Sequence, residues 1–128
     1  MKLINTTSAP AAIGPYSQGF TVGNFLFTSG QIPLDPETGD VSGQTVGEQA
    51  ERAIANLKAV LEAGGSSLAE VIKTTCFLAD MADFAAFNEV YAKHFPGKPA
   101  RSCVAVKQLP KSVLCEIEAI AEVDRRQR

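Results

Sequence analysis

The stretch TVGEQAERAIANLKAVLEAGG, residues 45–65, decides the fold because it predicts one long amphipathic helix. Thr45 and Glu48 have the spacing of a capping box, in which each side chain hydrogen-bonds the backbone of the other residue. The pair Gly64-Gly65 ends the helix. Apolar residues recur between these ends at helical spacing and form one stripe: Val46, Ala50, Ala53, Ile54, Leu57, Val60 and Leu61. Such a stripe needs a second layer of structure to cover it.

The segment before this helix predicts a β-hairpin. Residues 20–22 and 26–31 read as strands, and Gly23-Asn24 between them is a strong signal for a tight turn. Residues 33–40 are rich in proline, aspartate and glycine, which is typical of a polar loop. Residues 2–5 are a candidate for an additional strand at the N-terminus.

The segment after the helix predicts three strands and a second helix. Residues 71–79 are rich in β-branched side chains and predict a strand. Asp80 can cap the following helix, which Pro96-Gly97 ends and which carries Phe84, Phe87, Val90, Tyr91 and Phe95 on one side. Two strands follow at 101–106 and 113–123. The order ββ-α-β-α-ββ predicts an α+β sandwich, with two helices on one face of a mixed sheet.

Composition narrows the class of protein. The 128 residues fit a single domain, 1–128, and 45% hydrophobic with 20% charged residues is ordinary globular composition. The longest apolar runs are too short for a membrane helix, and residues 1–10 lack the apolar core of a secretory signal. A formal net charge of −2 disfavours binding to nucleic acid.

The cysteines and the histidine suggest a cytoplasmic protein without a metal site. Cys76, Cys103 and Cys115 show neither paired spacing nor Cys/His spacing, so reduced thiols are expected rather than a disulfide framework or zinc. His94 is the single histidine. Its place late in the second helix favours a role at the helix end over a catalytic one.

The last predicted strand has one uniformly apolar face and one mixed face. The apolar set fits beneath the helices: Val113, Cys115, Ile117, Ala119 and Ala121. The mixed set consists of Leu114, Glu116, Glu118, Ile120 and Glu122. A face turned wholly to water should not need Leu114 and Ile120, so we expect it to pack against another subunit. Scattered surface hydrophobic residues are the alternative.

Arginine and glutamate are the first candidates for chemistry. Arg101 opens an apolar strand, where a guanidinium can bind a carboxylate through two hydrogen bonds; a surface salt bridge is the alternative. Glu116 and Glu118 share one strand face, and a partly desolvated carboxylate can act as general acid or base; a solvated face is the alternative. The two strands are joined by a short loop, so pairing between them would bring Arg101 and Glu116 close.

Smaller residues could complete such a site. Tyr16 lies in a glycine-flanked loop that could approach a ligand, or it could be partial core. Ser29 and Gly30 end a strand and could hydrogen-bond a small polar ligand. Cys103 could be a nucleophile, but without a nearby histidine it reads more naturally as a small hydrophobic residue.

Several ordered segments resemble the Rid family, the reactive intermediate deaminases formerly called YjgF. The resemblance covers nearly the whole chain and is most specific at residues 99–104 (PARSCV), followed by 116–119 (EIEA). Three further segments match: 11–18 (AAIGPYSQ), 28–33 (TSGQIP) and 87–91 (FNEVY). Arg101 places the chain nearest the RidA-like branch. Cys115 departs from the aliphatic residue usual in the family, and the tail 124–128 extends beyond the shared pattern.

The resemblance implies a chorismate-mutase-like fold and a homotrimer with sites between subunits. It implies hydrolysis of 2-iminobutanoate or 2-iminopropanoate, products of pyridoxal-phosphate dehydratases, to 2-oxo acids and ammonia without a cofactor of its own. Arg101 would bind the substrate carboxylate and Glu116, rather than Glu118, would activate water. The remaining substrate contacts would come from Tyr16, Ser29, Gly30, Asn88 and the backbone of Cys103.

Three other functions stay open at this stage. A regulatory trimer could bind 2-oxo acids without turnover, using the same pocket and arginine. Endoribonuclease or translation-inhibitor activity has been attributed to the family, although the acidic chain offers little for it. A hydrophobic patch could also support a chaperone role.

Overall fold

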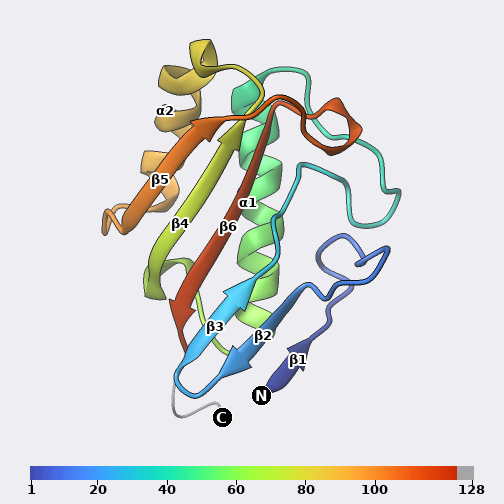
Figure 1. Cartoon of the computed structure of the whole chain (residues 1–128), viewed down its shortest axis with the longest axis vertical. Coiled ribbons are helices and arrows are strands. Elements are labelled where there is room, and N and C mark those ends of the chain that lie inside the picture. Colours follow the sequence, from blue (N-terminus) through green and yellow to red (C-terminus); the bar gives the residue numbers. More distant parts are fainter. Residues whose placement is uncertain (124–128) are drawn as a thin grey trace.

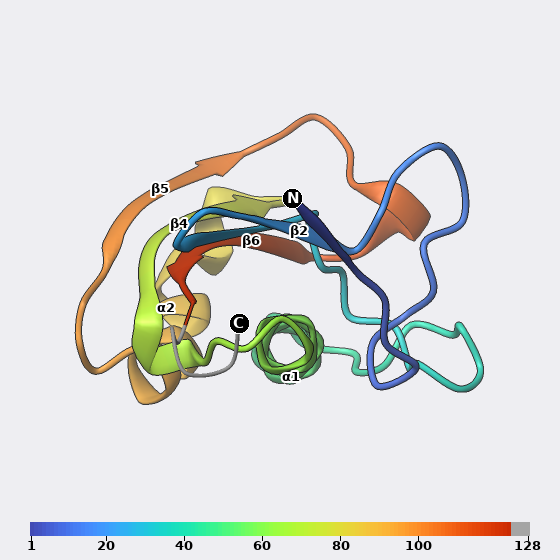
Figure 2. The same ribbon diagram turned by 90° about the horizontal axis from the view of Figure 1, so that it is seen from below.

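The computed structural model describes residues 1–123, in which two α-helices cover one face of a six-stranded sheet (Figures 1 and 2). The helices are α1 (Val46–Ala63) and α2 (Phe84–His94). The strands are β1 (Lys2–Ile4), β2 (Gly19–Val22), β3 (Phe25–Thr28), β4 (Val71–Leu78), β5 (Ala100–Ala105) and β6 (Cys115–Glu122). Their order across the sheet is β1-β2-β3-β6-β4-β5. No helix within the described part of the chain has the length and apolar character needed to cross a membrane.

Helix α1 forms as the sequence predicts. The Thr45 side chain accepts a hydrogen bond from the Glu48 amide, and the Glu48 carboxylate accepts one from the Thr45 amide. Every residue of the predicted apolar stripe is buried in the hydrophobic core. Figure 2 views this helix along its axis and shows it on the same side of the sheet as α2.

Three predicted element boundaries are wrong. The last strand, predicted at 113–123, is β6 (Cys115–Glu122), so it begins two residues later than predicted. Strand β3 ends at Thr28, and of the remaining predicted strand residues, 29–31, only Gln31 makes a bridge, to Ile117 on β6. The chain turns out of the sheet at Ser29-Gly30, where the Ser29 amide bonds the Gln18 carbonyl (2.9 Å). Helix α2 begins at Phe84, because Asp80 caps a separate 3₁₀ turn (Met81–Asp83) by accepting from the Ala82 amide.

The position of β6 corrects the predicted strand pairing. Strands β5 and β6 follow each other in the chain, yet β4 lies between them, parallel to β5 and antiparallel to β6. The crossover through α2 makes β5 an edge strand, and β6 fills the place between β3 and β4. Pairing between residues 101–106 and 113–123 therefore does not occur.

Two buried polar side chains of α1 hold the loops around the site. Asn56 donates to the carbonyls of Ile32 (3.0 Å) and Leu34 (2.9 Å). Gln49 accepts from the Leu114 amide (2.7 Å) just before β6. These contacts satisfy buried backbone groups that no strand partner reaches. The periodicity of the helix does not reveal them, since both residues interrupt its apolar stripe.

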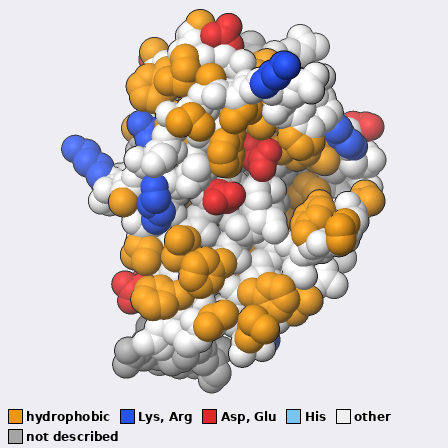
Figure 3. Space-filling model, viewed as in Figure 1, with side chains coloured by type: hydrophobic (Ala, Val, Ile, Leu, Met, Phe, Trp, Pro, Cys, Tyr) orange, Lys and Arg blue, Asp and Glu red, His pale blue; other side chains and the backbone are white. Residues whose placement is uncertain are grey.

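The sheet face opposite the helices is open and partly apolar (Figure 3). Its large exposed hydrophobic residues include Leu3, Val22, Phe25, Phe27 and Val104. Ile120 also lies on this face, as predicted, half-buried between Phe27 and Lys73. Leu114 does not, because it precedes β6 and packs against the core. The apolar character of the open face thus comes mainly from β1, β2 and β3.

Candidate functional site

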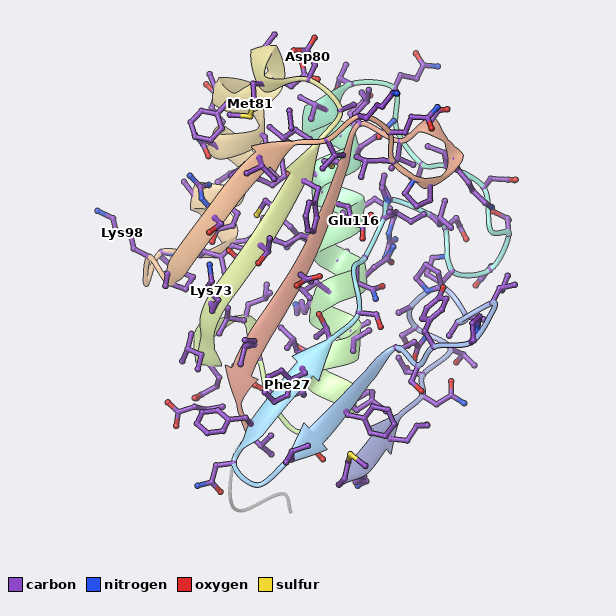
Figure 4. The ribbon with its side chains drawn as sticks, in the orientation of Figure 1. Phe27, Lys73, Asp80, Met81, Lys98 and Glu116 are labelled. Atoms are coloured by element: carbon purple, nitrogen blue, oxygen red, sulfur yellow. The ribbon has the colours of Figure 1, made fainter. Side chains whose placement is uncertain are left out.

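Glu116 lies in a hollow on the open face of the sheet (Figure 4). The hollow has a volume of about 460 Å³ and is lined by Tyr16, Ser29, Gly30, Ile32, Pro110, Glu116 and Glu118. Four separate segments meet there: the loop before β2, the turn after β3, the connection between β5 and β6, and β6 itself. Four of these residues, Tyr16, Ser29, Gly30 and Glu116, are predicted site residues, and the structure brings them together.

The bridge between Gln31 and Ile117 sets the spacing inside this hollow. Its two backbone hydrogen bonds (2.7 and 3.0 Å) hold the turn after β3 against β6, beside Glu116. A side chain at position 30 would collide with the Glu116 carboxylate. Glycine at position 30 therefore allows the Glu116 carboxylate to lie this close to the turn, and close approach rather than backbone conformation favours it there.

The loop carrying Tyr16 is held by the buried amide of Gln18. That side chain accepts from the Thr6 amide (2.7 Å) and donates to the Thr6 and Pro10 carbonyls (3.0 and 2.9 Å). Tyr16 itself is 54% exposed, so its interpretation as partial core is wrong. Ser29 donates its hydroxyl to the Ser17 carbonyl, which leaves its oxygen able to accept a hydrogen bond.

Glu116 has the electrostatics of a proton acceptor. Partial burial raises the pKa of its carboxyl group, and the nearby charge of Glu118 raises this pKa further. A carboxylate with a raised pKa binds a proton more readily than one in open water. Glu116 and Glu118 both border the hollow, so the alternative of a fully solvated face is wrong for Glu116, which is half-buried.

Arg101 lies on β5, where its side chain faces helix α2. Its Nη1 donates to Asn88 Oδ1 (2.7 Å), and its guanidinium lies over the rings of Tyr91 (4.7 Å) and Phe84 (5.5 Å). No carboxylate among residues 1–123 forms an ion pair with it, so the surface salt bridge expected as the alternative is not found within this part of the chain. The side chain borders a second hollow, of about 470 Å³, whose wall includes Asn88 and Pro99.

One chain does not bring Arg101 and Glu116 together. Arg101 is in register with the buried Thr74, on the helix side of β4, whereas Glu116 is in register with Phe77, on the open side. Strand β4 also separates the two strands that carry them. The expectation that pairing would make them neighbours is therefore wrong within a single chain. Each occupies its own half of a potential site.

Cys103 and His94 take structural positions. Cys103 packs against the core in register with Cys76, and burial raises the pKa of its thiol, which disfavours a nucleophilic thiolate. All three cysteines are free thiols. His94 pairs with Glu51 of α1, as does Lys93 (3.2 Å), so this end of α2 is joined to α1. Within residues 1–123 no cluster of three or more His, Cys, Asp or Glu could hold a metal ion.

Sequence reasoning missed the aromatic partners of Arg101. Phe84 and Tyr91 were assigned only to the apolar side of the second helix, whereas the structure also places them beneath the guanidinium. The β4-α2-β5 crossover brings α2 alongside β5, and this connection is the signal that could have found them. Asn88, which the resemblance implies as a substrate contact, lies beside Arg101 in the structure.

Fold and site together define the class. The chain belongs to the family described as Endoribonuclease L-PSP, whose model matches residues 6–123. The same family includes YjgF and RutC proteins, which confirms the resemblance seen in the sequence.

Particular relatives are similar over almost their full length. A RutC family protein of Pyrococcus abyssi is 54% identical over 94% of this chain and 95% of its own. The 2-iminobutanoate/2-iminopropanoate deaminase of Escherichia coli is 50% identical over 94% and 96%. The crystal structure of E. coli TdcF with bound serine is 48% identical, with a TM-score of 0.91 over 97% and 100%. Other similar proteins carry provisional names as a regulator and an endoribonuclease.

Proposed function

We propose that this chain is a homotrimeric deaminase that hydrolyses 2-iminobutanoate and 2-iminopropanoate to 2-oxo acids and ammonia. The observation that carries the proposal is the pair of half-sites: an arginine without a carboxylate partner in residues 1–123, and a half-buried glutamate with a raised pKa. A small anionic substrate with an electrophilic carbon needs both groups. The E. coli relative named as this deaminase supports the choice of reaction.

Assembly of three chains would join the two half-sites. The open sheet face exposes Phe25 and Phe27 at 44% and 45%, which favours burial against a second copy. In the chorismate-mutase-like trimer that we infer, Arg101, Asn88 and Cys103 of one chain would face the hollow of the next. That hollow supplies Tyr16, Ser29, Gly30 and Glu116.

Arg101 would bind and orient the substrate. Its planar guanidinium can hold the carboxylate through two parallel hydrogen bonds. The Ser29 oxygen is available to accept a hydrogen bond from the substrate N–H, and Tyr16 would cover the bound molecule. The serine seen in TdcF has the same carboxylate and an adjacent nitrogen, which supports a ligand of this class.

Glu116 would then move the proton that hydrolysis requires. Water attacks C2 of the iminium group while its proton passes to the Glu116 carboxylate, giving a tetrahedral amino alcohol. Glu116 returns this proton to nitrogen, the C–N bond breaks, and ammonia leaves as C=O forms and the hydroxyl proton passes to the Glu116 carboxylate. The imine arrives already activated, so the chain needs no cofactor. Positioning with one acid/base group is sufficient for a reaction that also proceeds unaided.

A coupled assay with a chemical trap tests this function. A serine/threonine dehydratase generates the imine, semicarbazide competes for it, and the protein is added or withheld. We expect the protein to lower semicarbazone formation and to raise the rate of 2-oxo acid release, and Arg101→Ala to abolish both effects. Semicarbazone formation that stays unchanged at all protein concentrations would refute the proposed deaminase activity. Binding of the 2-oxo acid without faster imine loss would instead support a regulatory trimer, the function suggested by the relative named as a regulator.

A further inference from the structure

Among residues 1–123, the guanidinium of Arg101 contacts aromatic rings and has no acidic partner. The Arg101 carbon Cζ lies 4.7 Å from the centroid of Tyr91 and 5.5 Å from that of Phe84. Its hydrogen bond to Asn88 uses only one of its nitrogens. A guanidinium has five N–H donors, so the contact to Asn88 leaves others for a ligand in the same plane.

Tyr91 is itself fixed from two sides. Its hydroxyl shares a hydrogen bond of 2.7 Å with Thr74 Oγ1, and Thr74 is fully buried on β4. Its ring stacks on Phe95 with centroids 4.5 Å apart. Tyr91 is only 7% exposed, so its ring has little freedom to turn. The surface beneath the guanidinium is therefore rigid.

We propose that Tyr91, tethered by Thr74, is a positioning residue that orients Arg101 for the substrate carboxylate. This role rests on the proposed function, since it needs Arg101 to bind a carboxylate. An aromatic ring attracts a cation through its face but, unlike an acidic side chain, leaves the positive charge available to an incoming anion. An ion pair with a resident carboxylate would fix Arg101 equally well but would compete with the substrate.

The competing explanation is that Tyr91 and Thr74 only fill the core. Both explanations predict lower thermal stability when either residue is replaced, because both residues are buried. Only the positioning role predicts weaker binding of a carboxylate in a folded protein. Phe87 provides a matched control, since it is a buried ring of the same helix, with its centroid 6.0 Å from that of Tyr91, and it makes no ring contact with Arg101.

The experiment measures Kd for 2-oxobutanoate, the proposed product, together with kcat and KM for imine hydrolysis. Tyr91→Leu removes the ring, and we expect Kd and KM to rise about tenfold while kcat changes less. Tyr91→Phe and Thr74→Val each remove the tether and should raise Kd about threefold. The variant that combines Tyr91→Phe with Thr74→Val should have the same Kd as either single variant, because both changes remove the same hydrogen bond. Phe87→Leu should lower the melting temperature but leave Kd within about twofold of wild type.

The outcomes separate this inference from the proposed function. A wild-type protein that neither binds 2-oxobutanoate nor speeds imine loss would refute the function, and the role of Tyr91 with it. A wild-type protein that does both, with Kd unchanged in folded Tyr91→Leu, would refute the positioning role alone. Equal weakening by Phe87→Leu would also refute it, in favour of general packing. If Tyr91→Leu does not fold, the two conservative variants decide: unchanged Kd in both overturns the inference.

Discussion

Glu116 and Glu118 cannot be distinguished by strand periodicity, and their surroundings separate them only in part. Both border the same hollow, but the pKa of Glu116 is raised by burial, and Gly30 lies directly against its carboxylate. At the scale of single residues, Glu116 is therefore the stronger candidate for the base.

Replacing Glu116 by glutamine keeps the shape and removes the proton acceptor. We expect Glu116→Gln to lower kcat for imine hydrolysis about 10²-fold, the low end for an acid/base group, because the uncatalysed reaction is already fast. Glu118→Gln is the matched control and should lower kcat far less. Initial rates of imine loss in variants of confirmed mass and melting temperature give the comparison. If Glu118→Gln lowered the rate more than Glu116→Gln, the assignment of Glu116 as the base would be wrong.

Gly30 should be needed for the position of Glu116 rather than for folding. A methyl group there meets the end of a flexible side chain, so the Gly30→Ala protein can fold by displacing the Glu116 carboxylate. We expect activity to fall at least about tenfold, because a misplaced general base loses much of its effect. Gly97→Ala is the control, since a Cβ at Gly97 meets no atom within 4 Å. Full activity in Gly30→Ala would show that Glu116 need not lie against this turn.

At the scale of elements, locally determined features could be predicted and pairing could not. The cap at Thr45, the apolar stripe of α1 and the hairpin turn at Gly23 depend on neighbouring residues, and all three are confirmed. The place of β6 in the sheet depends on contacts with β3 and β4, which are distant in the sequence. The alternation of side chains in residues 115–122 shows which of them share a face but does not identify the neighbouring strands. For this reason, the expectation that strand pairing would bring Arg101 and Glu116 close together is wrong within one chain.

The contact between α1 and α2 should weaken at low pH. The hydrogen bond from His94, followed by that from Lys93, lowers the pKa of Glu51 in the folded protein. A lowered folded-state pKa means that the stabilisation exists above the unfolded pKa of a glutamate and is lost as pH falls through the folded value. Glu51 is 45% exposed, so solvent screening limits the effect to below about 1 kcal/mol.

Glu51→Gln tests this contact. We expect a melting temperature a few degrees below wild type at pH 7, with the difference closing as pH falls below the ordinary glutamate range. Thermal unfolding of both proteins between pH 7 and pH 3 measures this difference in melting temperature. A constant difference over this range would mean that the charge of Glu51 contributes nothing and that the variant acts through packing.

At the scale of the whole molecule, the open sheet face should hold the assembly together. We expect light scattering to give three times the chain mass of 13.6 kDa. Phe27→Glu places a charge on this face and should dissociate the trimer, because burying an unpaired carboxylate is costly. Met81→Glu is the control, since Met81 is similarly exposed (43% against 45%) but lies off the sheet, before α2 (Figure 4). If the Phe27→Glu protein is still a trimer, the interface between subunits must lie on another surface.

The separation of Arg101 from Glu116 leads to a prediction that only a shared site can satisfy. Arg101→Ala and Glu116→Gln should each be nearly inactive alone. If a site takes its arginine from one chain and its glutamate from the next, mixed trimers contain some interfaces with both groups intact. Random assembly from equal amounts restores about one quarter of the wild-type sites, because each of the two contributing chains must be of the right kind.

The mixture is prepared by unfolding the two variants together and refolding them, so that chains exchange. We expect the refolded mixture to recover about one quarter of wild-type activity, whereas each variant refolded alone stays inactive. Mixing without unfolding controls for contamination and slow exchange. A site built within one chain would give no recovery at any ratio, since every chain lacks one of its two groups. That result would contradict the positions of Thr74 and Phe77, which place Arg101 and Glu116 on opposite faces of the sheet.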